Sequence, residues 1–410
     1  MENNTVAGSH GSRSDEDTFP KLQSKTWGKE ILSGPRVTRA LRHDSSLERR
    51  RLRLMSSFLS LVFLFLAHGS YGQEPRAQIS LQIDRLEHAM KSAPASDSSA
   101  DEAASLQQVR KALDAGYVYA SLYGLEPAML NIATLQYTLS KVGLESKGLE
   151  AFEKEWQRVG TQLKAEEQGL TDAKLSSLPS AVRAMVEAAQ VQSRTYYQAA
   201  RLYGRETTPQ YGLQYVGLSK GYLDFAVWCA DLQFPNSPAW KGHSPGNDIA
   251  GLEKEVIRNY SQPQALKQNE EFIGINSRLN FARELDKQGR WEGALQIYLN
   301  ASLAYGLINP PSAGDLQLGA LQEESKGLRN RLAAGHLDWS LGQMYWEIAQ
   351  LDLEGQADKK MDKADAIHAG VILKEVLPRY LSYLEHSAPT ASATPAAAQV
   401  TVTLVRWPYT

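Results

Sequence analysis

Cysteine is almost missing from this 410-residue chain, which contains only Cys229. A single thiol cannot form an intramolecular disulfide, and zinc or haem sites built on a C-x-x-C pair are excluded for the same reason. Cys229 lies in the apolar run FAVWCADL, which favours a buried small side chain over a catalytic thiol. We therefore expect the fold to be held together by its hydrophobic core alone.

Motifs that carry enzyme chemistry are also scarce. The sequence has no G-x-x-x-x-G-K-[ST] phosphate loop, no G-x-G-x-x-G fingerprint and no H-E-x-x-H metal motif. Ser219 lies in G-L-S-K-G, the pattern of a hydrolase nucleophile elbow, but that elbow needs a strand before the serine. Helical periodicity runs through this stretch, so we do not expect a nucleophile elbow at Ser219. Together with the missing motifs, this predicts no catalytic residue, no cofactor, no metal and no enzymatic activity.

A strongly basic surface is absent as well. The 44 lysine and arginine residues are balanced by 46 aspartate and glutamate residues, and an arginine cluster lies near the N-terminus at 49–53. The rest of the chain is mildly acidic. Nucleic-acid binding requires a concentrated basic face, so we do not expect it here.

An apolar segment near the N-terminus has the pattern of a secretory signal. The basic cluster at 49–53 precedes the apolar residues 58–67, and the small residues Ser70 and Gly72 follow. The apolar run is shorter than the ~20 residues that a spanning helix needs. We expect an exported periplasmic or secreted protein, cleaved after Gly72, with membrane anchoring by residues 58–67 as the alternative.

Composition divides the chain into segments. Small, polar and proline-containing stretches separate a region of continuous helical periodicity from both ends of the chain. We expect a disordered leader with a misassigned start at 1–54, the signal hydrophobic region at 55–72, a short helix and linker at 73–103, a helical repeat domain at 104–386, a flexible linker at 387–399 and a strand-like tail at 400–410.

Apolar residues in the central region recur at helical spacing, which predicts an all-α fold. Gly217 and Gly221 are one helical turn apart, and glycine costs about 1 kcal/mol inside a helix, so a partner helix should approach closely over them. The clearest apolar stripes are Tyr211, Tyr215, Leu218, Tyr222, Phe225 and Cys229, and then Leu337, Leu341, Met344, Ile348 and Leu351.

A Tyr-Gly pair followed within a few residues by proline occurs three times, at Gly124, Gly204 and Gly306. Each pair follows an apolar helical pattern. Glycine adopts the left-handed conformation that ends helices, and proline cannot continue one. We interpret the three pairs as the C-terminal ends of similar helices in hairpins of roughly 34 to 40 residues.

One helical hairpin can be outlined between residues 277 and 306, SRLNFARELDKQGRWEGALQIYLNASLAYG. Small side chains at Ala282 and Ala294 would let the two helices cross, and Gly289 would form the turn between them. Tyr298 and Ala301 would fill the later packing positions.

This unit resembles the tetratricopeptide repeat family, and LGQMY at 341–345 resembles part of a first helix of that repeat. The resemblance implies antiparallel hairpins stacked as an α-solenoid, with a concave surface that binds protein partners. The unit departs from the family at Arg278, where an early tryptophan is expected, and its closing prolines are displaced to Pro310 and Pro311. A generic helical bundle is the alternative.

The loop FPNSPAWKGHSPGND at 234–248 is chemically richer than its neighbours. Trp240, Lys241, His243 and Asp248 are candidates for contact with a ligand or partner. The alternative is a proline-stiffened connection in which Asn247 or Asp248 caps the following helix.

The last residues, VTVTLVRWPYT at 400–410, alternate like a strand. Trp407 and Tyr409 are candidate partner contacts, because a terminal strand can add to the edge of a partner's sheet. Docking on the chain's own body and disorder remain open.

These observations predict a non-catalytic protein-protein interaction scaffold of the bacterial cell envelope or periplasm. Its partner would be a protein, and its inner helices would present tyrosines such as Tyr196, Tyr197 and Tyr215. The alternative is an all-α ligand-binding protein or enzyme that uses the 234–248 loop.

Overall fold

The computed structural model describes residues 75–92, 99–234, 242–260, 269–334, 338–354 and 363–387. All regular structure in these ranges is helical, which confirms the all-α fold class. In chain order the helices are α3 (Pro75–Ser92), α4 (Ser99–Asp114), α5 (Val118–Ser140), η2 (Glu145–Lys147), α6 (Leu149–Glu167), α7 (Asp172–Ser176), α8 (Ser180–Glu206), α9 (Pro209–Ala230), α10 (Gly246–Tyr260), α11 (Asn269–Lys287), α12 (Trp291–Ile308), η4 (Ala313–Leu316), α13 (Leu318–Ala334), α14 (Ser340–Glu354), α15 (Lys363–Val371), η5 (Ile372–Val376) and α16 (Leu377–Ser387).

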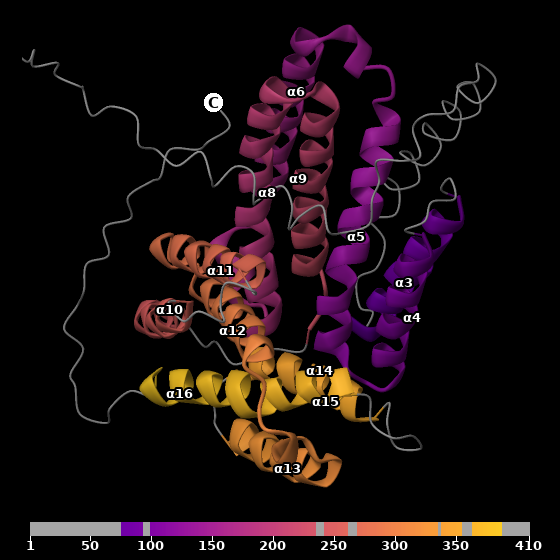
Figure 1. Cartoon of the computed structure of the whole chain (residues 1–410). Coiled ribbons are helices and arrows are strands. Elements are labelled where there is room, and N and C mark those ends of the chain that lie inside the picture. The colour runs from indigo at the N-terminus through magenta and orange to yellow at the C-terminus, as the bar shows by residue number, and fades with distance from the viewer. Residues whose placement is uncertain are drawn as a thin grey trace, which may run out of the picture.

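Four long helices, α5, α6, α8 and α9, stand side by side and form the tall part of the molecule (Figure 1). α6 runs antiparallel to α8. Trp156 stacks on Tyr197 with 4.5 Å between ring centroids, and Glu153, earlier in α6, pairs with Arg205, later in α8. α9 packs against both α8 and α5. The aromatic and aliphatic side chains between these helices form the upper part of the core.

The α5–α9 pair confirms the expected close approach over the two glycines of α9. A Cβ atom on Gly217 would lie 2.9 Å from the Cα of Thr134, and one on Gly221 would lie 3.2 Å from the Cα of Leu130. Because Gly217 faces Thr134 and Gly221 faces Leu130, the two helices run antiparallel. Any larger side chain would separate them.

The three Tyr-Gly pairs do not end helices, so that interpretation was wrong. Gly124, Gly204 and Gly306 lie inside α5, α8 and α12, and none has a positive φ. A Cβ atom at these positions would lie 2.8, 2.4 and 2.4 Å from side chains of α4, α6 and α15. The recurrence therefore reflects close packing of neighbouring helices and not termination.

The proline that follows the first Tyr-Gly pair does not end the helix either. Pro127 lies within α5, which continues to Ser140. Leu125, Ala128 and Met129 on both sides of the proline are buried, so packing favours continuing the helix although the proline ring removes one backbone hydrogen bond.

The hairpin expected at 277–306 is present as α11 and α12, which pack against each other along their length. Gly289 makes the turn with φ +70°, a left-handed value that favours glycine. Ala282, Ala294 and Ala301 are fully buried and Tyr298 nearly so, as expected of residues at a helix crossing.

The C-terminal helices form a layer across the base of the four long helices (Figure 1). α14 packs on both α5 and α8, and the helical stretch α15, η5 and α16 packs against α12 and α14. The α3–α4 hairpin packs against α5, and Arg110 of α4 pairs with Asp84 and Glu87 of α3. The interior is thus continuous from α3 to α16.

None of the helices in the described ranges combines the length and the apolarity needed to cross a membrane. The expected leader and signal region, the linker at 387–399 and the tail with Trp407 and Tyr409 lie outside the described residues. α4 begins at Ser99, inside the range expected to be a linker.

Candidate functional site

Helix N-termini from distant parts of the chain meet near the junction of the long helices and the basal layer. Asp338, just before α14, accepts hydrogen bonds from the backbone N–H of Ser180 at 2.5 Å and of Ser340 at 2.9 Å. The Ser340 hydroxyl accepts from the N–H of Ala181 at 3.0 Å. The side chains that precede and begin α14 thus cap α8, which fixes the two helices against each other.

Two more buried glutamates cap helices in the same way. Glu347 of α14 accepts from the N–H groups of Tyr119 and Ala120 in the first turn of α5, both at 2.9 Å. Glu187 of α8 accepts from the N–H of Gly293 in the first turn of α12, also at 2.9 Å. Negative or acceptor groups at helix N-termini are favoured by the helix dipole as well as by the hydrogen bonds.

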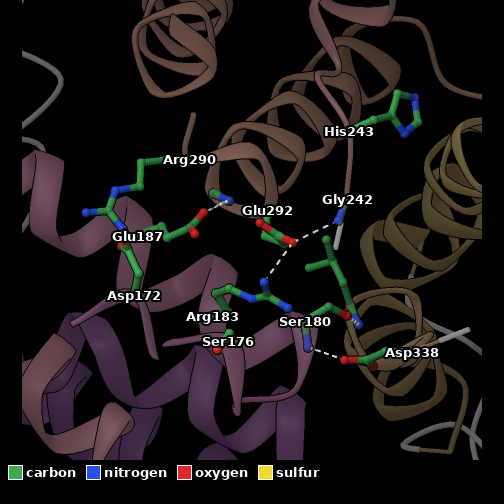
Figure 2. A network of polar contacts seen from close by, with 12 residues as sticks. Asp172, Ser176, Ser180, Arg183, Glu187, Gly242, His243, Arg290, Glu292 and Asp338 are labelled. Atoms are coloured by element: carbon green, nitrogen blue, oxygen red, sulfur yellow. Dashed lines mark hydrogen bonds and ion pairs between the residues drawn. The ribbon is translucent and has the colours of Figure 1, made fainter. Parts of the chain in front are cut away.

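A cleft of ≈ 390 Å³ opens beside this junction, between α7, the start of α8 and the α11–α12 turn (Figure 2). Arg183 of α8 pairs with Glu292 of α12 at 3.2 Å, and the N–H of Gly242 donates to the same carboxylate at 3.1 Å. The residues that line the cleft are Asp172, Leu175, Ser176, Arg183, Glu187, Gln288, Gly289, Arg290, Trp291 and Glu292.

Burial, followed by the charge of Glu292, raises the pKa of Glu187 to about 8. The Glu187 carboxyl is therefore mostly protonated at neutral pH. The arrangement can hold a proton on Glu187, while Arg183 balances the charge of Glu292. The described residues contain no group of three or more metal-binding side chains, and the Ser176 hydroxyl donates to the carbonyl of Ala173.

The 234–248 loop is described in part, because Trp240 and Lys241 lie outside the described residues. His243 is held by α16: its N–H donates to the Tyr383 hydroxyl at 2.9 Å, that hydroxyl donates to the His243 carbonyl at 2.7 Å, and the rings stack at 4.2 Å. Asp248 is half-buried in the first turn of α10.

Neither Asn247 nor Asp248 precedes α10, so the interpretation that one of them caps this helix was wrong. The helix begins at Gly246, so Asn247 and Asp248 lie inside its first turn, and the Ser244 hydroxyl accepts from the Gly246 N–H at 3.2 Å. The loop therefore docks on the body through His243 and Tyr383, and its residues His243 and Asp248 do not line the cleft.

The two apparent nucleophiles, Ser219 and Cys229, are buried residues of α9. Ser219 is fully buried in mid-helix, and its hydroxyl donates to the carbonyl of Ser193 at 2.8 Å, so no nucleophile elbow is formed. Cys229 is also fully buried, and burial raises the pKa of its thiol. This confirms the interpretation of Cys229 as a small core residue.

The tyrosine candidates separate into core and surface. Tyr197 is buried, and its hydroxyl donates to the Trp156 carbonyl at 2.9 Å, while Tyr215 is only 4% exposed. Tyr196 is half-buried and stacks on the half-buried Tyr222 of α9, with 5.2 Å between centroids.

Tyr123 of α5 and the two tyrosines of this pair all lie within electrostatic range of Glu126. Tyr123 is half-buried, and its hydroxyl donates to the Asn300 side chain at 3.3 Å. We name the half-buried Tyr123, Tyr196 and Tyr222, from α5, α8 and α9, the tyrosine surface.

Sequence reasoning missed Arg183, Glu187 and Glu126. The signal was present: AVRAMVEAAQV and YGLEPAML place charged residues within apolar helical runs, where burial forces each to find a partner or stay neutral. No protein-family model, curated protein or solved structure matches the chain, so these residues must be interpreted from their geometry.

Proposed function

We propose that this chain is a non-catalytic scaffold that binds a protein partner in the bacterial cell envelope. The observation that carries the proposal is the tyrosine surface, where three helices of one packed body hold Tyr123, Tyr196 and Tyr222 partly open to solvent. Tyrosine supplies large, amphipathic contact area with little rotamer freedom to lose, which suits a binding surface.

The buried carboxylates of the cleft and of the neighbouring helix N-termini have structural roles. Glu187, Asp338 and Glu347 each cap a helix, and Glu292 is paired with Arg183. These carboxylates hold together α5, α8, α12 and α14. Such a network favours a rigid scaffold over an acid-base site that must exchange protons with a substrate.

The finer parts of the proposal rest on the sequence together with the α11–α12 hairpin. Tetratricopeptide-like stacking is supported by the turn at Gly289 and by the buried small residues at the crossing of α11 and α12. Export to the periplasm is supported by the basic and apolar pattern of residues 49–72. The loop-based ligand site is not advanced, because the backbone and ring of His243 are engaged by Tyr383.

A capture experiment with the full chain tests the scaffold proposal. The baits are the native chain, a Tyr196→Ala/Tyr222→Ala variant and a Tyr260→Ala control, since Tyr260 is an exposed tyrosine on α10, a helix that contributes no residue to the tyrosine surface. We expect an envelope protein that the native and control baits retain and the double variant loses, with unchanged far-UV circular dichroism. Retention by all three baits, or by none, contradicts the proposal.

A further inference from the structure

Glu126 of α5 differs from the buried carboxylates of the described residues. Each of the latter has a partner: Arg194 for Glu167, backbone N–H groups for Glu187, Asp338 and Glu347, and Arg183 with Gly242 for Glu292. The hydrogen bonds and ion pairs that show this are all shorter than 3.3 Å. Within the described residues the half-buried Glu126 carboxylate makes neither a hydrogen bond nor an ion pair.

The helix packing places Glu126 beside the tyrosine surface. α5 and α9 are antiparallel, with Leu130 against Gly221. Glu126 is one turn before Leu130 on α5, and Phe225 is one turn after Gly221 on α9. Glu126 is therefore level with Phe225, which lies between Tyr222 and Cys229 along α9. Glu126 is also one turn beyond Tyr123 on α5.

The electrostatics agree with this placement. Burial, and next the charge of Glu126, raises the pKa of Tyr123 to about 12, and the same charge contributes to the raised pKa values of Tyr196, Tyr222 and Cys229. The cation Arg278 of α11 acts on Tyr123. Burial alone raises the pKa of Glu126 to about 7, so no positive charge in the described ranges offsets its desolvation.

A second acceptor without a partner lies on the adjoining helix. The Oε1 atom of Gln192 is buried and accepts no hydrogen bond from the part of the chain that the structure describes. Gln192 is one turn before Tyr196 on α8. The Glu126 carboxylate and the Gln192 amide oxygen are thus two acceptors that receive no hydrogen bond from the described residues, and they lie beside tyrosine rings. An ammonium group carries three donors, no acceptor and a positive charge that is attracted to aromatic faces.

We propose that Glu126, Gln192 and the tyrosine surface form a binding site for an organic ammonium group, supplied by a lysine side chain of a peptide partner or by a free amine. The inference rests on the proposed scaffold function and gives the chemistry of its contact. The ammonium would donate to the Glu126 carboxylate and the Gln192 amide oxygen, and it would lie against tyrosine rings.

Calorimetric titration of the full chain tests this site. The probes are Nα-acetyl-lysine methylamide, its neutral isostere Nα-acetyl-norleucine methylamide, and n-butylammonium as the free amine. We expect both ammonium probes to bind and the neutral isostere to bind about tenfold more weakly or not at all. Tighter binding of the lysine probe assigns the site to peptides, and equal binding assigns it to free amines.

The pH dependence of binding adds a test on the native protein. Binding should release a proton near pH 7 and tighten between about pH 6 and 8, because the ammonium favours the ionised Glu126. The neighbouring tyrosines and Cys229 remain neutral in this range, since their pKa values are raised. Binding without proton release would contradict the role of Glu126.

The matched variants are Glu126→Gln and Asp224→Asn. Asp224 is an exposed carboxylate of α9 near Lys220 and Glu166, and it lies two residues after Tyr222, which places it on another side of that helix. We expect Glu126→Gln to lose ammonium binding about tenfold or more and Asp224→Asn to retain it. Equal binding by both variants, or no preference of the native chain for ammonium over the isostere, overturns the site.

The outcomes also separate this inference from the scaffold proposal. A protein partner that depends on Tyr196 and Tyr222 but is retained by Glu126→Gln would leave the scaffold standing and remove the ammonium site. Ammonium binding without any captured partner would leave the site standing and remove the scaffold.

Discussion

The carboxyl of Glu187 should make the stability of this protein fall as the pH rises. Its side chain is 4% exposed, and burial together with Glu292 raises its pKa from an ordinary 4.5 to about 8. Between these values the folded state holds a proton that the unfolded chain has released. The stabilisation is therefore complete below about pH 4.5 and is lost as the pH rises through 8.

The magnitude follows from the size of the shift. One pKa unit corresponds to about 1.4 kcal/mol, so Glu187 should lower the free energy of unfolding by roughly 4 to 5 kcal/mol between acidic and alkaline pH. Glu187→Gln removes this titration, and its amide oxygen can still accept from the Gly293 N–H. The variant should match the native protein at about pH 5 and exceed its stability by several kcal/mol at about pH 9.

Urea unfolding followed by far-UV circular dichroism at the two pH values measures the difference directly. Glu253→Gln is the control, because Glu253 is a partly exposed glutamate paired with Arg283 and should change stability by less than about 1 kcal/mol at either pH. If Glu187→Gln loses the same stability at both pH values, Glu187 acts as a charged cap and the reasoning from burial is wrong.

Three further changes test the packing and the caps by the same unfolding measurement. Gly204→Ala should lower the free energy of unfolding by about 1 to 3 kcal/mol, since its Cβ would lie 2.4 Å from an aromatic ring of α6. The control Gly251→Ala, with open space around it in α10, should be neutral or stabilise the protein by up to about 1 kcal/mol. Equal effects of the two variants would exclude close packing as the reason for glycine at position 204. Gly289→Ala should cost about 1 kcal/mol because of its φ of +70°, and no loss would mean that the turn rearranges. Asp338→Ala should cost roughly 2 to 4 kcal/mol by leaving two buried N–H groups without acceptors, and a loss below about 0.5 kcal/mol would show that other groups replace the cap.

Much of the candidate site could not be read from the sequence. The apolar context of Glu187 and Glu126 indicated burial but not their partners. Glu187 bonds Gly293, which is far away along the chain, whereas Glu126 has no partner among the described residues. Tyr196 and Tyr197 are adjacent and chemically identical, yet Tyr196 belongs to the tyrosine surface and Tyr197 to the core. Adjacent residues in a helix point about 100° apart, and only the positions of the neighbouring helices decide which one is covered.

The sequence by itself determined the helical class, the helix through Gly217 and Gly221, and the hairpin with its turn at Gly289. These features depend on local quantities, namely the spacing of apolar residues and the conformational freedom of one glycine. The tertiary structure alone decided that Gly124, Gly204 and Gly306 lie within helices, since a glycine inside a helix and one at its end have the same side chain and differ only in what packs against them. It also decided which carboxylates are paired, because a capping bond such as Asp338 to Ser180 exists only once helices that are distant in sequence have been brought together.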